Sequence, residues 1–276
     1  MTSPNIAVIG AGNMGASLIG GLIQDGHPKD KLWVADTSIE KLTPLRDRFG
    51  IHVTTDNKTA AKQADIVILA LKPPMIAPVA RELSSVIRER KPLLISIAAG
   101  ISTTHIKRML GDASPIIRAM PNTPALIGCG ATALFANATV AKETRNLAES
   151  TLRAVGSIVW LPDESLMDIV TALSGSGPAY FFLIMDALQK GAESLGLPKE
   201  TARLLTLQTA LGAARMAIES STPLDELRRQ VTSPGGTTEK AISVLEENNI
   251  GALLKNALQA AMLRSKELAT ILEEEN

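Results

Sequence analysis

A glycine motif, Gly10-Ala-Gly-Asn-Met-Gly15, lies between a short apolar run and a helical stretch near the start of the chain. The apolar run, Asn5 to Ile9, is rich in residues that favour β-strands. Helical periodicity begins near Met14 and continues to about Asp25. A strand, a glycine turn and a helix in this order are typical of the first part of a βαβ unit, whose strands belong to a parallel sheet. The chain is therefore expected to begin as an α/β protein.

As far as Pro162, stretches with strand character alternate with helical stretches. Further strands are expected at residues 32–35, 51–54, 65–71, 92–97, 116–120, 131–136 and 157–161, and further helices at about 39–49 and 75–90. After Pro162 the pattern is helical, apart from two glycine-rich interruptions. The alternation predicts an α/β Rossmann-type doubly wound sheet over residues 1–162. An all-α C-terminal domain is expected over residues 163–276.

The composition narrows the class of protein. The 276 residues include 28 basic and 28 acidic ones, so nothing in the charge favours a nucleic-acid partner. No signal peptide is expected, and no uninterrupted apolar run reaches the roughly 18 residues of a membrane span. The one cysteine, Cys129, has no cluster of metal ligands beside it and is expected to be a small buried residue. We expect a cytoplasmic protein with no membrane partner and no metal site.

The glycine motif has the chemistry of a dinucleotide-binding turn. Gly10 is expected to make the turn, Gly12 to let a pyrophosphate approach the backbone, and Gly15 to allow close helix packing. The N–H groups around Asn13 and Met14, at the start of the helix, would meet the phosphates. Because strand, turn and helix all stand in the required order, the motif predicts a dinucleotide site.

Asp36 ends the second expected strand. A carboxylate there can accept a hydrogen bond from the ribose 2′-OH of NAD(H), whereas a 2′-phosphate favours a neighbouring Arg or Lys. Neither Thr37 nor Ser38 is cationic, although both can donate to a phosphate. The cofactor is therefore expected to be NADPH or NADH, with the choice open. Asp36 as a simple helix cap is the alternative.

Three more loops follow the ends of expected strands, where ligands bind in doubly wound sheets. They are Ala70-Leu-Lys-Pro-Pro74, Ser96-Ile-Ala-Ala-Gly100 and Met120-Pro-Asn-Thr-Pro124. Each could also be an ordinary strand-to-helix connection. Beyond the glycine motif, the residues expected to bind the cofactor are Asp36, Ser38, Asn57, Ala70, Leu71, Lys72, Pro73, Ala98, Ala99 and Asn122.

A second polar segment, Val231-Thr-Ser-Pro-Gly-Gly-Thr-Thr-Glu-Lys240, separates two helical stretches near the end of the chain. It is typical of a tight turn that exposes backbone N–H groups and hydroxyls at a new helix N-terminus. Such a place can hold a carboxylate. Gly235 and Gly236 would let a ligand approach the backbone. Taken alone, the segment is more typical of a helix-capping turn.

Together these segments resemble the pyrroline-5-carboxylate reductase family over nearly the whole chain. The matching segments are Gly10 to Gly15, Ala70-Leu-Lys-Pro73, Ser96-Ile-Ala-Ala-Gly100, Arg118-Ala-Met-Pro-Asn-Thr-Pro124, Ala172-Leu-Ser-Gly-Ser-Gly-Pro-Ala-Tyr-Phe-Phe182 and Val231 to Lys240. The last two are the most specific. The resemblance implies NAD(P)H-dependent reduction of 1-pyrroline-5-carboxylate to L-proline, the last step of proline biosynthesis. It also implies a C-terminal dimerisation domain with interleaved helices, with dimers often assembled further into a ring, as in a homodecamer.

The resemblance also implies roles for individual residues. The substrate carboxylate would bind Ser233, Gly235, Gly236 and Thr237, while Thr238, the expected catalytic residue, would hydrogen-bond the ring nitrogen. Glu164 would face the substrate across the dimer; an exposed acid at the start of a helix is its alternative.

An imine nitrogen is basic enough to enter protonated, so the reaction needs no strong general acid. This fits the three histidines, His27, His52 and His105, which lie outside the motifs and are expected at the surface. Since Val231 to Lys240 lies in the interleaved domain, it is expected to complete the partner's cleft, and a folded monomer should be inactive.

Two alternatives are open. A 3-hydroxyacid dehydrogenase has a similar glycine turn and helical domain, but that family places a catalytic lysine where this chain has Phe181. A non-catalytic dinucleotide-binding protein would bind cofactor without turnover, and would leave the polar segment near Ser233 without a use.

Overall fold

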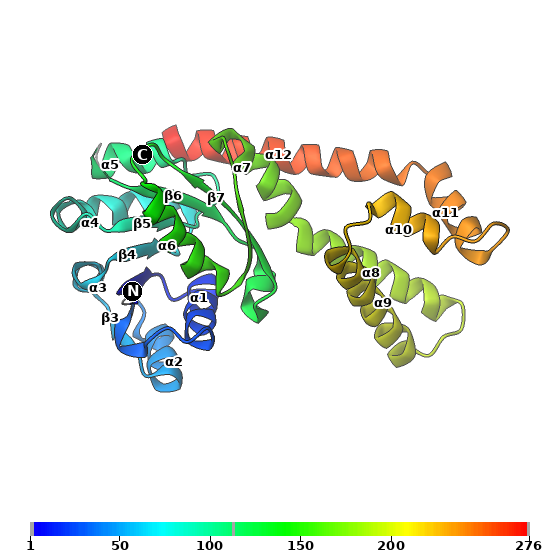
Figure 1. Ribbon diagram of the computed structural model, residues 1–276, viewed down its shortest axis with the longest axis horizontal. Helices are drawn as coiled ribbons and strands as arrows, with labels where there is room; N and C mark the ends of the chain where they lie inside the picture. Colours follow the sequence, from blue (N-terminus) through cyan, green and yellow to red (C-terminus); the bar gives the residue numbers. More distant parts are fainter. Residues whose placement is uncertain (1–2, 112–113, 275–276) are drawn as a thin grey trace. The chain divides into compact units, whose positions relative to one another are not determined.

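The computed structural model describes residues 3–111 and 114–274 (Figure 1). The chain divides into two compact units. Unit 1 comprises Met1–Ser176 and Ala261–Asn276, and unit 2 comprises Gly177–Ala260. The compact units divide after Ser176. The expected boundary at residue 162, between a dinucleotide-binding domain and a dimerisation domain, concerns function and stays a prediction.

Unit 1 is built on one mixed sheet (Figure 1). Its described strands are β1 (Ile6–Ile9), β2 (Leu32–Ala35), β3 (His52–Thr54), β4 (Ile66–Leu69), β5 (Leu93–Ser96), β6 (Ile116–Met120), β7 (Gly130–Ala136) and β8 (Gly156–Trp160). Their order is β3-β2-β1-β4-β5-β6-β7-β8. Neighbours from β3 to β6 are parallel, so these strands end at one edge of the sheet.

Helices cover both faces of the sheet because its central strands are apolar on both sides. In β4, Ile66 and Ile68 join one buried cluster, and Val67 and Leu69 join the other. The first cluster contains side chains of α1 (Asn13–Gln24), α2 (Ile39–Phe49) and α6 (Lys142–Arg153). The second contains side chains of α3 (Asn57–Gln63), α4 (Ile76–Arg90) and α5 (Thr103–Leu110). The expected Rossmann-type fold is confirmed.

Two strands depart from the parallel arrangement that the sequence predicted. β7 runs antiparallel to β6, and β8 is parallel to β7. The connection from β6 to β7 contains only the short 3-10 helix η3 (Thr123–Ile127), whereas a parallel return requires a crossover of about a dozen residues or more. Helices α3, α5 and α6 were not singled out in the sequence; α3 and α5 have only 7 and 8 residues.

A discontinuous helical segment follows the sheet within unit 1. It consists of the 3-10 helix η4 (Glu164–Leu166), the short helix α7 (Met167–Val170) and the π-helical turn η5 (Thr171–Gly175). The last helix, α12 (Ile250–Glu274), ends in unit 1: Ser265 Oγ donates to Asp168 Oδ1 at 2.7 Å, and Leu272 joins the second buried cluster. The end of the chain therefore completes the N-terminal unit.

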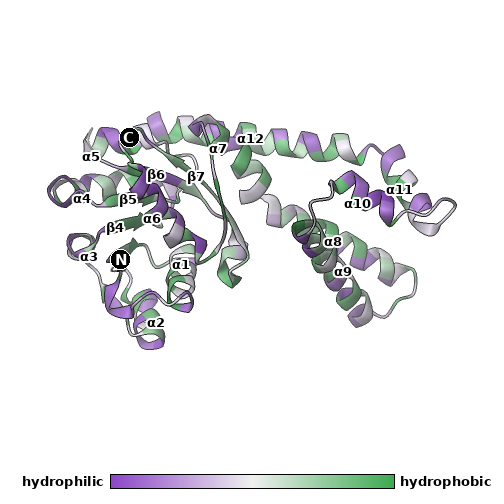
Figure 2. Ribbon diagram, viewed as in Figure 1, coloured by the Kyte–Doolittle hydropathy of each residue, from purple (hydrophilic) through white to green (hydrophobic). Residues whose placement is uncertain are grey.

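Unit 2 is all α-helix, as expected. It contains α8 (Gly177–Ser194), α9 (Lys199–Glu219), α10 (Leu224–Gln230), α11 (Thr237–Glu247) and the first part of α12. Within residues 177–260, only Gly177 and Ala202 are buried. Large apolar side chains such as Phe181, Phe182 and Leu211 are 60–67% exposed, and Figure 2 shows hydrophobic residues along α8. A unit with so little core exposes the kind of surface that packs against another subunit.

The described helices were compared with the length and composition of a membrane-spanning helix. One described helical stretch, Glu164–Ser194, is long and apolar enough to cross a membrane by these two criteria alone. It includes the exposed apolar residues of α8.

Two surface expectations were wrong. Cys129 is exposed, because it lies in the turn between η3 and β7. His105 is only 4% exposed, because α5 packs on the sheet. His52 is exposed, as expected, and stacks on Trp33 with ring centroids 4.5 Å apart.

Candidate functional site

The first and third glycines of the motif are fixed by packing. Gly10 has φ +111°, and a Cβ there would lie 2.3 Å from the carbonyl oxygen of Ala70. A Cβ at Gly15 would lie 2.1 Å from the carbonyl oxygen of Gly10. Both positions thus require glycine for the turn to lie against β4 and for α1 to follow it directly.

The middle glycine is different. A Cβ at Gly12 would meet no heavy atom within 4 Å, and its φ of −74° is accessible to any residue. Gly12 is therefore not required by the fold. It precedes α1, whose first N–H groups, including those of Asn13 and Met14, have no acceptor within the helix. Open space beside these donors fits the approach of a pyrophosphate.

Asp36 follows β2 at the same edge of the sheet. Its Oδ2 accepts from the N–H of Ala11 at 2.9 Å, and its Oδ1 accepts from the N–H of Ser38 at 3.0 Å. Partial burial raises the pKa of Asp36, but the bonds from Ser38 and Ala11 and the charge of Lys41 outweigh it and hold the pKa below its usual value. The group is therefore an anion tied to the glycine motif.

Lys41 is the residue that sequence reasoning missed here. Its Nζ lies 3.4 Å from both carboxylate oxygens of Asp36, and its side chain is 54% exposed. The local sequence indicates only Thr37 and Ser38 as neighbours of a 2′-phosphate. The start of α2 at Ile39 turns the chain back, which brings Lys41 beside Asp36. The helical periodicity after Ser38 was the available signal.

The other expected cofactor residues of unit 1 follow strand ends along this edge. The N–H of Ala70 donates to the carbonyl oxygen of Ile9 at 2.8 Å, which joins the loop after β4 to the end of β1. Leu71 and Pro73 are half-buried and Lys72 is exposed. Their roles in cofactor binding stay predictions.

Asn57 and Asn122 have other partners in the structure. Asn57 Nδ2 donates to Glu82 Oε2 at 3.0 Å. Asn122 Nδ2 donates to the carbonyl oxygen and Oγ of Ser174, both at 3.2 Å, and its Oδ1 accepts from the N–H of Ala131 at 2.9 Å. Asn122 thus links the loop after β6 to the π-helical turn and to β7.

Close packing explains a glycine in the turn that Asn122 contacts. A Cβ at Gly175 would lie 2.5 Å from Cε of Met120. Gly175 therefore leaves room for the end of the Met120 side chain beside β6. π-helical turns within α-helical segments are frequent at functional sites.

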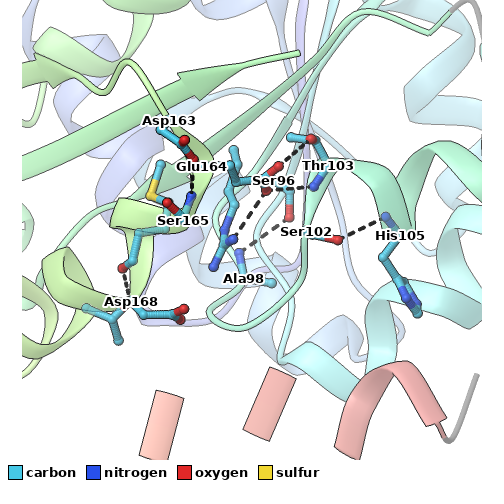
Figure 3. Close-up of polar contacts among 12 residues, drawn as sticks. Ser96, Ala98, Ser102, Thr103, His105, Asp163, Glu164, Ser165 and Asp168 are labelled. Atoms are coloured by element: carbon cyan, nitrogen blue, oxygen red, sulfur yellow. Dashed lines mark hydrogen bonds and ion pairs between the residues drawn. The ribbon is translucent and has the colours of Figure 1, made fainter. Parts of the chain in front are cut away.

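Glu164 lies in a buried network in unit 1 (Figure 3). Its Oε1 accepts from the N–H of Thr103 at 2.8 Å, and its Oε2 accepts from the Thr103 hydroxyl at 2.6 Å. Oε1 also pairs with Arg118 Nη1 at 3.2 Å. The expected role in substrate binding stays a prediction. In the structure this carboxylate joins η4 to β6 and to the start of α5.

A cavity of about 440 Å³ adjoins these loops in unit 1. It is lined by Pro73, Ala99, Gly100 and Thr171, and by residues of α12 that include Arg264 and Leu268. Pro73 and Ala99 are expected cofactor residues, so the cavity lies beside the loops where the dinucleotide is expected.

The segment around Ser233 to Thr238 lies in unit 2 and forms the turn between α10 and α11. Gly235 has φ +72°, a conformation that favours glycine. The N–H of Gly236 donates to the carbonyl oxygen of Ser233 at 3.0 Å, which closes the turn. Thr237 and Thr238 begin α11, so their N–H groups have no acceptor within the helix.

Glu239 is a second residue that sequence reasoning missed. Its Oε2 accepts from the N–H of Gly235 at 2.7 Å. A carboxylate therefore already binds the backbone of this turn. Glu239 is the third residue of α11, the position from which the acid of a capping box reaches back to the N-cap, and this spacing was the available signal. Here it reaches Gly235, one residue before the N-cap Gly236.

The predicted site residues thus form two sets. Those for the cofactor, with Glu164, belong to unit 1, and those for the substrate carboxylate belong to unit 2. Ser233, Gly235 and Thr237 are exposed and Thr238 is half-buried, so side chains of this turn are accessible within unit 2.

Comparisons with known proteins cover both sets. Residues 164–268 match the family model for pyrroline-5-carboxylate reductase dimerisation, and residues 5–100 match the model for NADP oxidoreductase, coenzyme F420-dependent. Pyrroline-5-carboxylate reductase of Pseudomonas aeruginosa is 48% identical over 269 residues, which span 98% of each chain.

Solved structures agree. A pyrroline-5-carboxylate reductase from Coxiella burnetii is 52% identical, with a TM-score of 0.94 over 97% of this chain and 99% of that one. The Plasmodium falciparum pyrroline carboxylate reductase with NADP bound is 29% identical, with a TM-score of 0.86 over 98% and 99% of the two chains. With a family-specific dimerisation region and close relatives over nearly its full length, the chain is a homo-oligomeric member of the pyrroline-5-carboxylate reductase family.

Proposed function

We propose that this chain reduces 1-pyrroline-5-carboxylate to L-proline with NAD(P)H, the last step of proline biosynthesis. The observation that carries the cofactor half of this proposal is the open space at Gly12. The fold requires the glycines on either side of it in the motif, but not this one. A residue without a side chain beside the free N–H groups of α1 suits a pyrophosphate.

The substrate half rests on the turn from Ser233 to Thr238. Its three hydroxyl side chains, those of Ser233, Thr237 and Thr238, and the first N–H groups of α11 form a set of donors with the partial positive charge of a helix N-terminus. We propose that this turn binds the substrate carboxylate. The N–H of Gly235 already donates to the carboxylate of Glu239, so it is a donor of the kind that a substrate carboxylate would use.

Bound NAD(P)H supplies the hydride for the imine carbon. The chain's own residues hold the substrate and its proton. Because the imine nitrogen is basic, it enters protonated, and Thr238 is proposed to orient it through a hydrogen bond from the ring N–H to its hydroxyl oxygen. The main catalytic effect would then be the orientation of ring and cofactor.

We also propose that two subunits complete each site. The cofactor residues and the carboxylate-binding turn belong to different compact units, and unit 2 has almost no buried residues of its own. A subunit contact made by unit 2 would cover the exposed apolar side chains of α8 and α9. Further assembly of dimers into a ring, as in a homodecamer, and a cytoplasmic location without a membrane partner belong to this proposal.

The alternative as a 3-hydroxyacid dehydrogenase lacks support. The lysine that such an enzyme requires would stand at Phe181, which is 67% exposed on α8. Without that lysine, oxidation of an alcohol has no acid or base at this position.

The direct test mixes purified protein with 1-pyrroline-5-carboxylate and either NADPH or NADH, and follows cofactor absorbance. We expect oxidation of at least one cofactor and formation of proline. Cofactor binding without oxidation would leave a non-catalytic dinucleotide-binding protein, and would overturn the proposed activity.

A further inference from the structure

We propose that Glu164 is a positioning residue, which fixes the loop between β5 and α5 at the dinucleotide site and does not contact the substrate. This loop comprises residues 97–102 and contains Ala98 and Ala99. The inference rests on the proposed function, because it concerns the cofactor of the same reaction.

The loop is held at both ends. At its beginning, Ile97 N–H donates to the carbonyl oxygen of Leu69 at 3.2 Å, and Ala98 N–H lies 3.5 Å from Ser96 Oγ. At its end, the backbone and hydroxyl of Thr103 both bind Glu164. The position of the loop therefore depends on β4 and β5 at one end and on Glu164 at the other (Figure 3).

The carboxylate of Glu164 has little capacity left for a substrate. An ionised carboxylate has about four acceptor sites. Three donors from this chain already use them: the N–H and hydroxyl of Thr103 and Nη1 of Arg118. The Glu164 side chain is 18% exposed. These contacts favour an internal role over contact with a ligand.

Buried Arg118 keeps Glu164 in place. Its side chain is 8% exposed, and its neighbour in the sheet register is Ser96, the last residue of β5. A buried guanidinium needs an anionic partner, because a lone charge in the interior is unfavourable. Glu164 therefore stays at this point of the sheet, and Thr103, bonded to it, is held beside the end of β5.

The consequence for function concerns the cofactor. If the loop of Ala98 and Ala99 contacts the dinucleotide, loosening its end at Thr103 lowers cofactor affinity, because the loop must be ordered on binding. The substrate carboxylate, bound by unit 2 in the proposed site, should be affected little. A residue that touched the substrate would show the opposite pattern.

The test uses two variants of the network and one control. Thr103→Val removes the hydroxyl bond but keeps the shape and the N–H bond. Glu164→Gln removes the charge at nearly constant shape. Asp163→Asn is the matched control, because Asp163 is an adjacent acid whose Oδ1 accepts from the N–H of Ser165, and asparagine can retain that bond.

For each protein, the dissociation constants of NADPH and NADH are measured by fluorescence titration without substrate, and kcat and KM are measured in turnover. Thr103→Val should raise the dissociation constants about 3- to 10-fold and Glu164→Gln about 10- to 30-fold, with the substrate KM within about twofold of wild type. Asp163→Asn should match wild type.

Two results would overturn the inference. If Glu164→Gln raises the substrate KM while cofactor affinity stays constant, Glu164 contacts the substrate. If Thr103→Val changes no dissociation constant, the network does not position the loop, whatever the fate of Glu164→Gln. The Thr103→Val comparison uses cofactor binding alone. It therefore stays decisive if the wild type binds NAD(P)H but reduces no pyrroline-5-carboxylate, a result that would overturn only the proposed function.

Discussion

The carboxylate of Asp36 accepts a hydrogen bond from the backbone N–H of Ala11, at 2.9 Å, so the acid after the second strand is bonded directly to the glycine motif after the first. Lys41 lies 3.4 Å from the same carboxylate. An anion and an exposed cation are therefore paired where the sequence predicts the adenosine ribose. This pair suggests how the chain distinguishes its two cofactors.

Replacing Asp36 with asparagine should move cofactor preference toward NADPH. The carboxylate repels a 2′-phosphate, and its lowered pKa keeps it charged at neutral pH. We expect the ratio of kcat/KM for NADPH to that for NADH to rise about 10-fold. Lys41→Met, the companion variant, should lower the same ratio. If neither ratio changes, the 2′-position lies away from this pair.

Gly12→Ala should separate binding from folding. Its Cβ meets no atom of the chain, so the melting temperature should be equal to or slightly above that of the wild type. NADPH affinity should fall at least about 10-fold, because the methyl group occupies the proposed pyrophosphate position. Calorimetry and fluorescence titration measure the two effects.

Gly15→Ala is the matched comparison for this prediction. Its Cβ would lie 2.1 Å from a backbone oxygen, so it should destabilise unit 1 by about 1–3 kcal/mol, although alanine favours helix. Unchanged NADPH binding by Gly12→Ala would contradict the proposed site.

Thr238→Ala tests the proposed orientation of the imine. Loss of one hydrogen bond that matters in the transition state should lower kcat/KM about 10- to 10³-fold, with NADPH affinity unchanged. Thr238→Ser keeps the hydroxyl and should recover most of the activity. An alanine variant with wild-type kinetics would remove Thr238 from the mechanism.

Phe182→Glu tests the role of the subunit contact. Phe182 is 64% exposed on α8 in unit 2, and burying a carboxylate in an apolar contact is unfavourable. We expect light scattering to show monomers, which bind NADPH but do not reduce the substrate. Ile127→Glu changes an even more exposed residue of unit 1, at 78%, and should stay oligomeric and active. An active Phe182→Glu monomer would show that one subunit suffices.

His105 should make stability depend on pH. Burial is the largest influence and lowers its pKa from 6.5; Glu273 opposes this effect, and Arg108 and Arg81 reinforce it. The unfolded chain therefore binds a proton more readily than the folded one. The stabilising effect of the neutral ring is complete above pH 6.5 and is lost as pH falls below 6.5 toward the lower folded pKa.

Urea unfolding between pH 7.5 and 5.5 measures this dependence. Below the unfolded pKa, protonation of His105 should lower the free energy of unfolding, by at most about 1.4 kcal/mol per pH unit. His105→Leu removes the titrating ring and should flatten the profile relative to wild type. Parallel profiles for the two proteins would mean that other groups cause the slope.

The dinucleotide-binding turn could be predicted from the sequence because its strand, glycine turn and helix follow one another directly. The strand, turn and helix around Gly12 are consecutive, and their periodicities differ. The antiparallel β7 could not be predicted in this way. Its direction depends on the short connection after β6, and the alternation of strands and helices alone does not specify it.

Contacts between residues far apart in the sequence could not be predicted from its pattern either. Glu164 and Thr103 are 61 positions apart, and only the fold brings η4 to the start of α5. An acid near a helix start has the same local appearance whether it faces solvent or a buried arginine. Lys41 was closer to prediction, because a helix beginning at Ile39 places it near Asp36.

Because α12 returns to unit 1, this unit is built from two segments that are far apart in the sequence. Near the end of the sequence, Ser265 donates a hydrogen bond to Asp168. Leu272 fills part of the buried cluster beneath α4 and α5. During synthesis the N-terminal unit must therefore wait for the last helix to leave the ribosome before its packing is complete, even though its sheet is made first. Unit 2, residues 177–260, is synthesised between the two segments of unit 1.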